Sequence, residues 1–296
     1  MPLWETRIEI APESAGDVET ALLESGCDGW TLLEDAVARR AWIVGIFRSD
    51  ADAESRWNEL RPTLPARPLG AAATRLLPDA DWRNSYRAHF KAWTFGRLHW
   101  VPVWERDTFR LPAGHSVLWL DPGLAFGTGN HETTRLCIER LVQFESALGG
   151  GGGAGGLRMA DVGCGSGILG LSAALLGFGE VLGFDNDPEA VAVSRENARL
   201  NSLAGRVRFT TAGLPAGFQG ASCDFVAANI QSDVLIRHCA DLSAAVAPGG
   251  TLAMSGILAS EIEGVRGAFA RTAPGWAHES RVSGEWCDLC LRRPPP

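Results

Sequence analysis

A regular alternation of short apolar stretches with longer amphipathic ones, between residues 115 and 293, constrains the fold of this 296-residue chain more than any other feature. The apolar stretches have the length of strands, and the amphipathic ones have apolar residues three and four positions apart, as on one face of a helix. Parallel strands need a crossover between them, and parallel sheets are buried on both faces. The alternation therefore predicts an α/β fold with a doubly wound, mainly parallel sheet.

The individual elements can be placed from this alternation. Strands are expected at residues 115–121, 157–163, 180–186, 206–212, 223–229 and 250–258. Helices are expected at residues 167–177, 187–201, 232–247 and 259–273, and another begins at the sequence HETT and carries Cys137, Leu141, Phe144 and Leu148 on its apolar face. Two closing strands, at residues 276–282 and 285–293, are joined by Ser-Gly-Glu, which leaves no room for a helix and predicts an antiparallel hairpin.

The first 78 residues have a different order of elements. Strands are expected at residues 4–11, 28–35, 39–49 and 71–78, with helices at residues 14–26 and 50–64. The order β-α-β-β-α-β predicts a small ferredoxin-like α+β domain, which serves for binding or scaffolding. The expected domains are therefore residues 1–78, a linker helix with an aromatic stripe at 79–93, and the α/β domain at 94–296.

Charge and cysteine content restrict the partners and the compartment. The net charge of −8 argues against direct binding of nucleic acid, and residues 1–78, with 13 acids against 8 arginines, account for −5 of it. Such acidity would steer a basic protein partner, or serve only solubility. Seven scattered cysteines favour reduced thiols, and no signal peptide or membrane span is present, so we expect a cytoplasmic protein and a monomer. Cys287 and Cys290 are three apart on a strand and point to opposite faces, so no metal site is expected.

A glycine-rich loop follows the strand at residues 157–163. The sequence DVGCGSGILG contains G-x-G-x-G at Gly163, Gly165 and Gly167, and ligands of open α/β sheets bind at the carboxyl ends of strands. Asp185 ends the next strand, where a carboxylate can accept both hydroxyls of a ribose. The same loop also contains G-x-G-x-x-G, so the loop alone leaves a NAD enzyme open, as it does a tight turn without ligand. Asp187 is explained as the N-cap of the following helix.

Three further features favour S-adenosyl-L-methionine over NAD. Asn229 ends the strand at residues 223–229, where its amide and neighbouring carbonyls can hold an amine, although a plain turn residue is the alternative. The closing hairpin suits a seven-stranded methyltransferase sheet and not the six parallel strands of a dinucleotide domain. The sequence DPGLAFGTGNHETT, residues 121–134, supplies a second glycine-rich wall, in which Gly127 allows the backbone to close over a cofactor.

These motifs together resemble one protein family. DPGLAFGTGNHETT, DVGCGSGIL, GFDNDP and ANI, with SGIL at 255–258 and GEW at 284–286, are similar to the ribosomal protein L-eleven (L11) methyltransferases over nearly the whole chain. The resemblance implies a seven-stranded, Rossmann-like methyltransferase sheet, S-adenosyl-L-methionine as cofactor, and a basic ribosomal protein, L11, as the substrate held by the N-terminal domain. It also implies that Thr134, Gly163, Asp185 and Asn229 contact the cofactor. Asn130, Tyr86 and the sequence that follows Asn229 and Ile230 depart from the family pattern.

The chemistry implied is transfer of a methyl group to an amine. A lysine amine, with a pKa of about 10.4, must lose a proton before it can accept a methyl group. Desolvation beside a positively charged sulfonium favours that loss. We expect Asn229 to orient the amine and the cofactor through hydrogen bonds, Thr134 to bind the methionine part of the cofactor, and Asp185 to bind its ribose. Phe126 can face the adenosyl or sulfonium group or be packed inward, and His131 is a capping residue or a general base.

Other functions compatible with the sequence are a methyltransferase for a different protein, a NAD-dependent dehydrogenase, and a binding module that has kept the fold without catalysis. A thermal-shift comparison of the two cofactors separates the dehydrogenase, and the absence of label transfer identifies the module.

Overall fold

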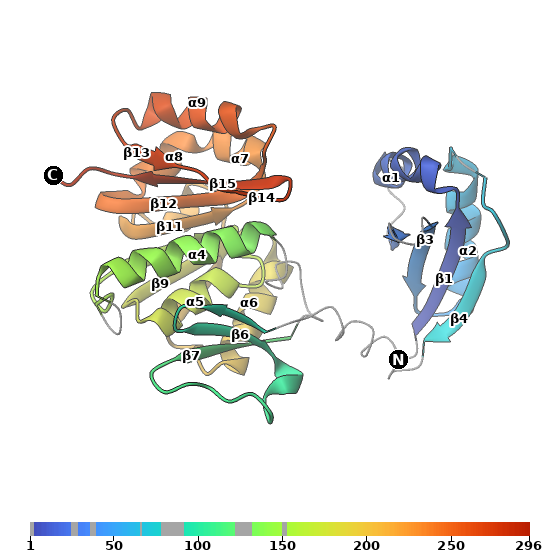
Figure 1. The fold of residues 1–296 in the computed structure, drawn as a ribbon, viewed down its shortest axis with the longest axis horizontal. Coiled ribbons are helices and arrows are strands. Elements are labelled where there is room, and N and C mark those ends of the chain that lie inside the picture. The colour runs from blue at the N-terminus through green and yellow to red at the C-terminus, as the bar shows by residue number, and fades with distance from the viewer. Residues whose placement is uncertain are drawn as a thin grey trace. The chain divides into compact units, whose positions relative to one another are not determined.

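The computed structural model describes residues 3–24, 29–35, 40–65, 67–77, 92–121, 132–149 and 153–296. The chain divides into two compact units, residues 1–89 and 90–296 (Figure 1). Within the ranges described, no helix is both long and apolar enough to cross a bilayer.

In its described residues, the N-terminal unit is a four-stranded antiparallel sheet with two α-helices. Its elements are β1 (Leu3–Ile10), α1 (Ala15–Glu24), β2 (Trp30–Asp35), β3 (Arg40–Phe47), α2 (Asp50–Leu60) and β4 (Ala73–Leu77). The strand order is β2-β3-β1-β4, which is the ferredoxin-like arrangement predicted. Ile8 and Ile10 lie two residues apart on β1, so both face the core shared with Val18 and Leu60 of the helices.

The second unit contains the large sheet. Its strands are β8 (Arg158–Val162), β9 (Glu180–Asp185), β10 (Val207–Thr211), β11 (Cys223–Asn229), β12 (Val246–Leu258), β13 (Ala277–Glu279), β14 (Val282–Ser283) and β15 (Trp286–Arg292). Its helices are α4 (Glu132–Ala147), α5 (Ile168–Leu176), α6 (Pro188–Leu200), α7 (Ser232–Arg237), α8 (Cys239–Ala244) and α9 (Ile262–Thr272). The order is β10-β9-β8-β11-β12-β15-β13, with the two-residue β14 also paired to β15. The first five strands in this order are parallel, and β13 and β15 form the predicted antiparallel closing hairpin.

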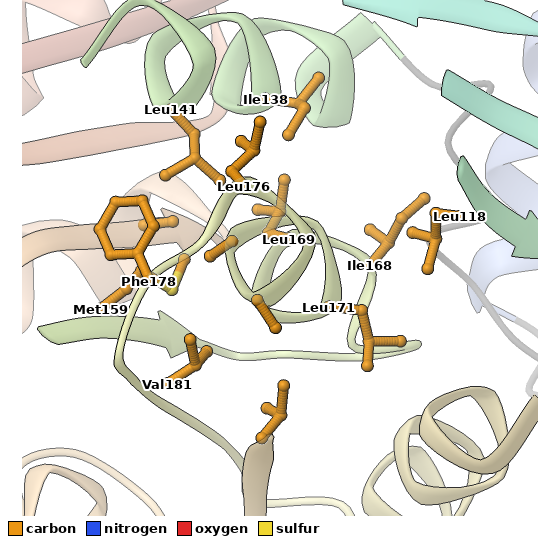
Figure 2. Close-up of a cluster of buried hydrophobic side chains, with 14 of the residues drawn as sticks. Leu118, Ile138, Leu141, Met159, Ile168, Leu169, Leu171, Leu176, Phe178 and Val181 are labelled. Atoms are coloured by element: carbon orange, nitrogen blue, oxygen red, sulfur yellow. The ribbon is translucent and has the colours of Figure 1, made fainter. Parts of the chain in front are cut away.

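Two cores, one on each face of this sheet, follow from the alternation of side chains along its strands. On β8, Met159 belongs to a core shared with α4, α5 and α6, whereas the next residue, Ala160, belongs to a core shared with α7, α8 and α9. Figure 2 shows the first core, where Met159 and Val181 of the sheet meet Leu169 of α5 and Leu141 of α4. The predicted fold class is therefore confirmed, with helices on both faces of the sheet.

A small second sheet differs from the prediction. The strand expected at residues 115–121 is present as β7 (Ser116–Leu120), but it pairs with β6 (Leu98–Pro102), which pairs with β5 (Trp93–Phe95). The expected linker helix, residues 79–93, lies outside the described residues except at its end, where Trp93 begins β5. The sheet is attached to the large unit by the buried Trp100, whose Nε1 donates to Ser172 Oγ of α5 at 2.9 Å.

Two helices also differ from expectation. The helix expected at residues 232–247 is divided into α7 and α8 at His238, whose imidazole bonds to Asp241 Oδ2 at 2.9 Å and whose backbone leaves the helical region. On α4, Cys137 and Leu141 are buried as predicted, but the helix ends at Ala147, and Leu148 beyond it is exposed.

Candidate active site

The residues predicted to form the site come from adjacent strands. β8 lies between β9 and β11, and the chain leaves β8 toward β9 on one side while β11 lies on the other. This is the point where strand order reverses, and ligands of open α/β sheets bind there, outside the carboxyl ends of the strands. The glycine loop follows β8, Asp185 ends β9 and Asn229 ends β11, so the three predicted features meet at one edge.

The glycine loop has a backbone that requires glycine. Gly163, Gly165 and Gly167 have φ values of 65°, 51° and 78°, in the left-handed region that disfavours residues with a Cβ. A Cβ on Gly167 would also lie 2.7 Å from Phe209 Cζ and 2.9 Å from Ser194 Cβ. The loop therefore passes close to its neighbours and opens directly into α5.

Two buried side chains of α6 hold the loop from behind. Ser194 Oγ donates to the carbonyl of Gly165 at 3.1 Å, and Asn197 Nδ2 donates to the carbonyl of Ser166 at 2.9 Å. Sequence reasoning missed both residues. The signal for them is two polar residues three apart on the side of α6 that also carries the buried Val191.

Asp185 is held in a fixed orientation by two backbone amides. Its Oδ2 accepts from Gly165 N at 2.9 Å and its Oδ1 from Asp187 N at 3.1 Å. An ionised carboxylate has about four acceptor sites, so two hydrogen bonds leave capacity for a pair of hydroxyl donors. Asp187 is the predicted N-cap, because its Oδ1 accepts from Glu189 N at 2.8 Å with Pro188 at the first helical position.

Asp161, the first residue of the glycine motif, was assigned no role from sequence. It is buried, and its Oδ2 accepts from Gly170 N at 2.8 Å, which satisfies one of the amides that have no partner within the first turn of α5. Burial raises the pKa of Asp161 to about 7, although the hydrogen bond from Gly170 acts in the opposite direction.

A pH dependence of stability follows from Asp161. Because its pKa is raised in the folded chain above the ordinary value of 3.8, the stability it contributes is complete below that value and is lost as the pH rises through about 7. We expect the melting temperature of the native chain, relative to that of Asp161→Asn, to fall between about pH 4 and about pH 7. A difference between the two melting temperatures that does not change with pH would contradict this.

Asn229 and Thr134 are brought together across the sheet edge. Asn229 Nδ2 donates to Thr134 Oγ1 at 3.2 Å, and Thr134 is buried in the first turn of α4. An amide nitrogen carries two hydrogens, so this bond uses one of them and fixes the orientation of the carboxamide. Figure 1 shows α4 lying along the sheet beside β11 and β12, which is why its N-terminal turn reaches the end of β11.

A buried ion cluster fixes α4 on the far strands of the sheet. Arg140 of α4 donates to both oxygens of Asp288 of β15, at 2.8 and 3.0 Å, and Arg281 donates to the same carboxylate through its backbone and guanidinium nitrogens. Arg140 also pairs with Glu279, and Arg281 with Glu139. Sequence reasoning missed this cluster, and its signal is an arginine between the apolar positions Cys137 and Leu141.

Three residues singled out from the sequence, Phe126, Gly127 and His131, lie outside the described residues. Cys287 and Cys290 are both buried on β15, with Cys287 in the core against α9 and Cys290 beside Arg140 and Phe144 of α4. In the part of the chain that the structure describes, no three His, Cys, Asp or Glu side chains are grouped so as to hold a metal ion.

Comparisons with known proteins agree on one family. The family model described as ribosomal protein L11 methyltransferase (PrmA) matches residues 2–294. A curated ribosomal protein L11 methyltransferase from Pseudomonas putida is 37% identical over 290 residues, covering 91% of this chain and 92% of the relative. One from Azotobacter vinelandii is 37% identical over 283 residues, with the same two coverages.

A solved structure agrees as well. The crystal structure of ribosomal protein L11 methylase from Lactobacillus delbrueckii subsp. bulgaricus is 29% identical, with a TM-score of 0.59. The match covers 69% of this chain and all of the other.

Proposed function

This chain belongs to the ribosomal protein L11 methyltransferase family, and on that premise we propose that it transfers methyl groups from S-adenosyl-L-methionine to amines of ribosomal protein L11. The amines are lysine side chains, the N-terminal α-amine, or both. The observation that carries this proposal is the meeting of the glycine loop, Asp185 and the Asn229–Thr134 pair at the switch point of the sheet.

The described residues fit the cofactor. The left-handed glycines Gly163 and Gly165 shape the loop that follows β8, and the backbone of this loop is a wall against which an adenosyl group can lie. The carboxylate of Asp185, already oriented by two amides, would accept the two ribose hydroxyls. Thr134 would contact the methionine part, and from the sequence Phe126 and Gly127 would close over the cofactor.

Catalysis by this chain is then a matter of placing and deprotonating the amine. The cofactor, when bound, supplies a methyl group on a positively charged sulfur that needs no acid to depart. Asn229, at the end of β11, would accept from the amine through Oδ1 while Thr134 holds its Nδ2. Placement of the nitrogen in line with the methyl group can supply several kcal/mol of the barrier. Desolvation of the amine beside the positively charged sulfur would lower its pKa, because both effects disfavour the ammonium form.

The proposed role of Asp185 in binding the ribose is tested by comparing its replacement with that of the nearby Asp187. Asp185→Ala is expected to raise the Kd of S-adenosylhomocysteine about 100-fold, from two charged hydrogen bonds of about 1.5 kcal/mol each. Asp187→Ala is the matched control: it removes a helix cap, costs about 1 kcal/mol of stability and leaves the affinity unchanged. Equal losses of affinity in the two variants, measured by calorimetry, would show that Asp185 acts only through the fold of the loop.

The two units have separate roles in this proposal. Residues 1–78 would recognise the substrate, residues 79–93 would link the units, and residues 94–296 would carry out the transfer. The net charge of −5 on residues 1–78 supports a basic protein partner. With a ribosomal substrate the reaction would take place in the cytoplasm, and the enzyme would act as a monomer without contacting nucleic acid directly.

The proposal is tested by label transfer. The chain is incubated with methyl-labelled cofactor and either purified L11 or total ribosomal proteins from cells that lack this activity, and the labelled band is identified. Label on L11 supports the proposal. Label on another protein would show that L11 is not the substrate. Stabilisation of the chain by NAD without any methyl transfer would show that it is not a methyltransferase.

A further inference from the structure

Ile230, the residue after Asn229, lies between two glycines from the neighbouring strands. β11 runs parallel to β8 on one side and β12 on the other, with Ala228 opposite Val162 and Asn229 opposite Ser255. One residue further along, Ile230 lies opposite Gly256 of β12, and its side chain reaches Gly163, which follows β8. Both glycines are left-handed, with φ values of 65° and 80°.

Both contacts use the space of a missing Cβ. A Cβ on Gly163 would overlap Cγ2 of Ile230, and a Cβ on Gly256 would lie 2.5 Å from the carbonyl oxygen of Ile230 and 2.9 Å from its carbonyl carbon. Gly256 lies where the pairing of β12 with β15 shifts register between Met254 and Ile257. Such irregularities re-aim a strand beside a site. The side chain of Ile230 thus contacts Gly163, just after β8, and its backbone contacts Gly256 of β12.

We propose that Ile230 is a positioning residue for methyl transfer, which fixes the Asn229 carboxamide by locking the end of β11 between Gly163 and Gly256. This inference rests on the proposed function of Asn229. The branched Cβ of isoleucine restricts χ1, so Cγ2 has one preferred place, against Gly163. Thr134 accepts a hydrogen bond from the carboxamide of Asn229, and Ile230 fixes the backbone next to Asn229. The two constraints therefore act on the Asn229 side chain from its two ends.

If Ile230 acts as a positioning residue, the kcat values of its variants should follow the presence of Cγ2 and not the volume of the side chain. Ile230→Val keeps Cγ2 and loses only the terminal methyl group, whereas Ile230→Leu keeps the volume and loses the branch at Cβ. We expect Ile230→Val to retain kcat within about twofold and Ile230→Leu to lose about tenfold, with KM for L11 and Kd for the cofactor unchanged. Ile230→Ala, which also lacks Cγ2 and adds no bulk, is expected to behave like Ile230→Leu.

The experiment combines kinetics of the full chain with an observation of Asn229 itself. In an Asn229→Ala background, Ile230→Leu should have no further effect on kcat, because a residue that acts through Asn229 is not additive with it. In chains labelled with 15N-asparagine, the Asn229 side-chain amide signal, identified by its loss in Asn229→Ala, should be the same in the native chain and Ile230→Val and shifted in Ile230→Leu.

Three results would overturn the inference: an unshifted amide signal in Ile230→Leu, additive losses in the double variant, or kcat values that follow melting temperature across the series. The amide signal does not depend on the substrate. If the native chain transfers no label to L11, the proposed function fails, while the comparison of amide signals still decides the role of Ile230.

Discussion

Replacing Asn229 by alanine is expected to lower kcat for methyl transfer about 100-fold or more, while the Kd of S-adenosylhomocysteine changes less than about threefold. The reason is that Asn229 is assigned to orienting the amine and not to binding the ribose or the adenine, which belong to Asp185 and the glycine loop. A displacement of about 1 Å in a reacting group is enough for a loss of this size. Single-turnover transfer to L11 and calorimetry of cofactor binding measure the two quantities separately.

Thr134 supplies the matched variants for this prediction. Thr134→Ser keeps the hydroxyl that accepts from Asn229 and should retain most of the activity, whereas Thr134→Val has nearly the same shape and removes the acceptor. A chain that lost cofactor affinity but not kcat on replacement of Asn229 would assign that residue to the cofactor alone. Equal activities of the serine and valine variants would show that the hydrogen bond between Asn229 and Thr134 does not contribute to catalysis.

Replacing Asp288 by alanine is expected to lower the free energy of unfolding by about 3–5 kcal/mol. Asp288 is 1% exposed and accepts from both Arg140 and Arg281, and Arg140 is itself only 4% exposed. Removal of the carboxylate leaves the Arg140 guanidinium buried with only Glu279 as an acidic partner among the described residues. Urea denaturation followed by circular dichroism measures the loss.

The control for this prediction is the other acid on Arg140. The side chain of Glu279 is 52% exposed, and pairs with that exposure contribute about 0–1 kcal/mol, so Glu279→Gln should be close to the native chain. If Asp288→Ala were as stable as Glu279→Gln, the cluster would not hold α4 to the sheet. The joint replacement of Arg140 and Asp288 by apolar residues of similar volume is expected to recover much of the loss, because neither charge of this buried pair remains.

The fold of the large unit could be predicted from the spacing of apolar residues along the chain and from the lengths of the links between elements. The short strand at residues 157–163 and the helix at 167–177 differ in period, and the Ser-Gly-Glu link allows only a hairpin. β5 and β6 were missed because their residues are buried without alternation, as in β6, and such a stretch has no period to recognise. The division at His238 depends on a bond to Asp241 that spacing alone does not indicate.

The site could be predicted in part. Asp185 and Asn229 follow from their positions at strand ends, since the carboxyl ends of parallel strands share one edge. Thr134 was placed by resemblance, because its partner Asn229 is 95 positions away in the chain and no local pattern links the two. Asp161 and Ile230 are unremarkable in the sequence, and their importance arises from contacts with Gly170, Gly163 and Gly256 that exist only in the folded chain.

A crystal structure of the full chain with S-adenosylhomocysteine tests most directly whether the carboxyl edge of β8, β9 and β11 binds the methyl donor. We expect both ribose hydroxyls on the carboxylate of Asp185, the nucleoside against Gly163 and Gly165, and the sulfur facing the carboxamide of Asn229. A nucleoside bound elsewhere, or Asp185 without contact to it, would contradict the assignment of this edge as the active site.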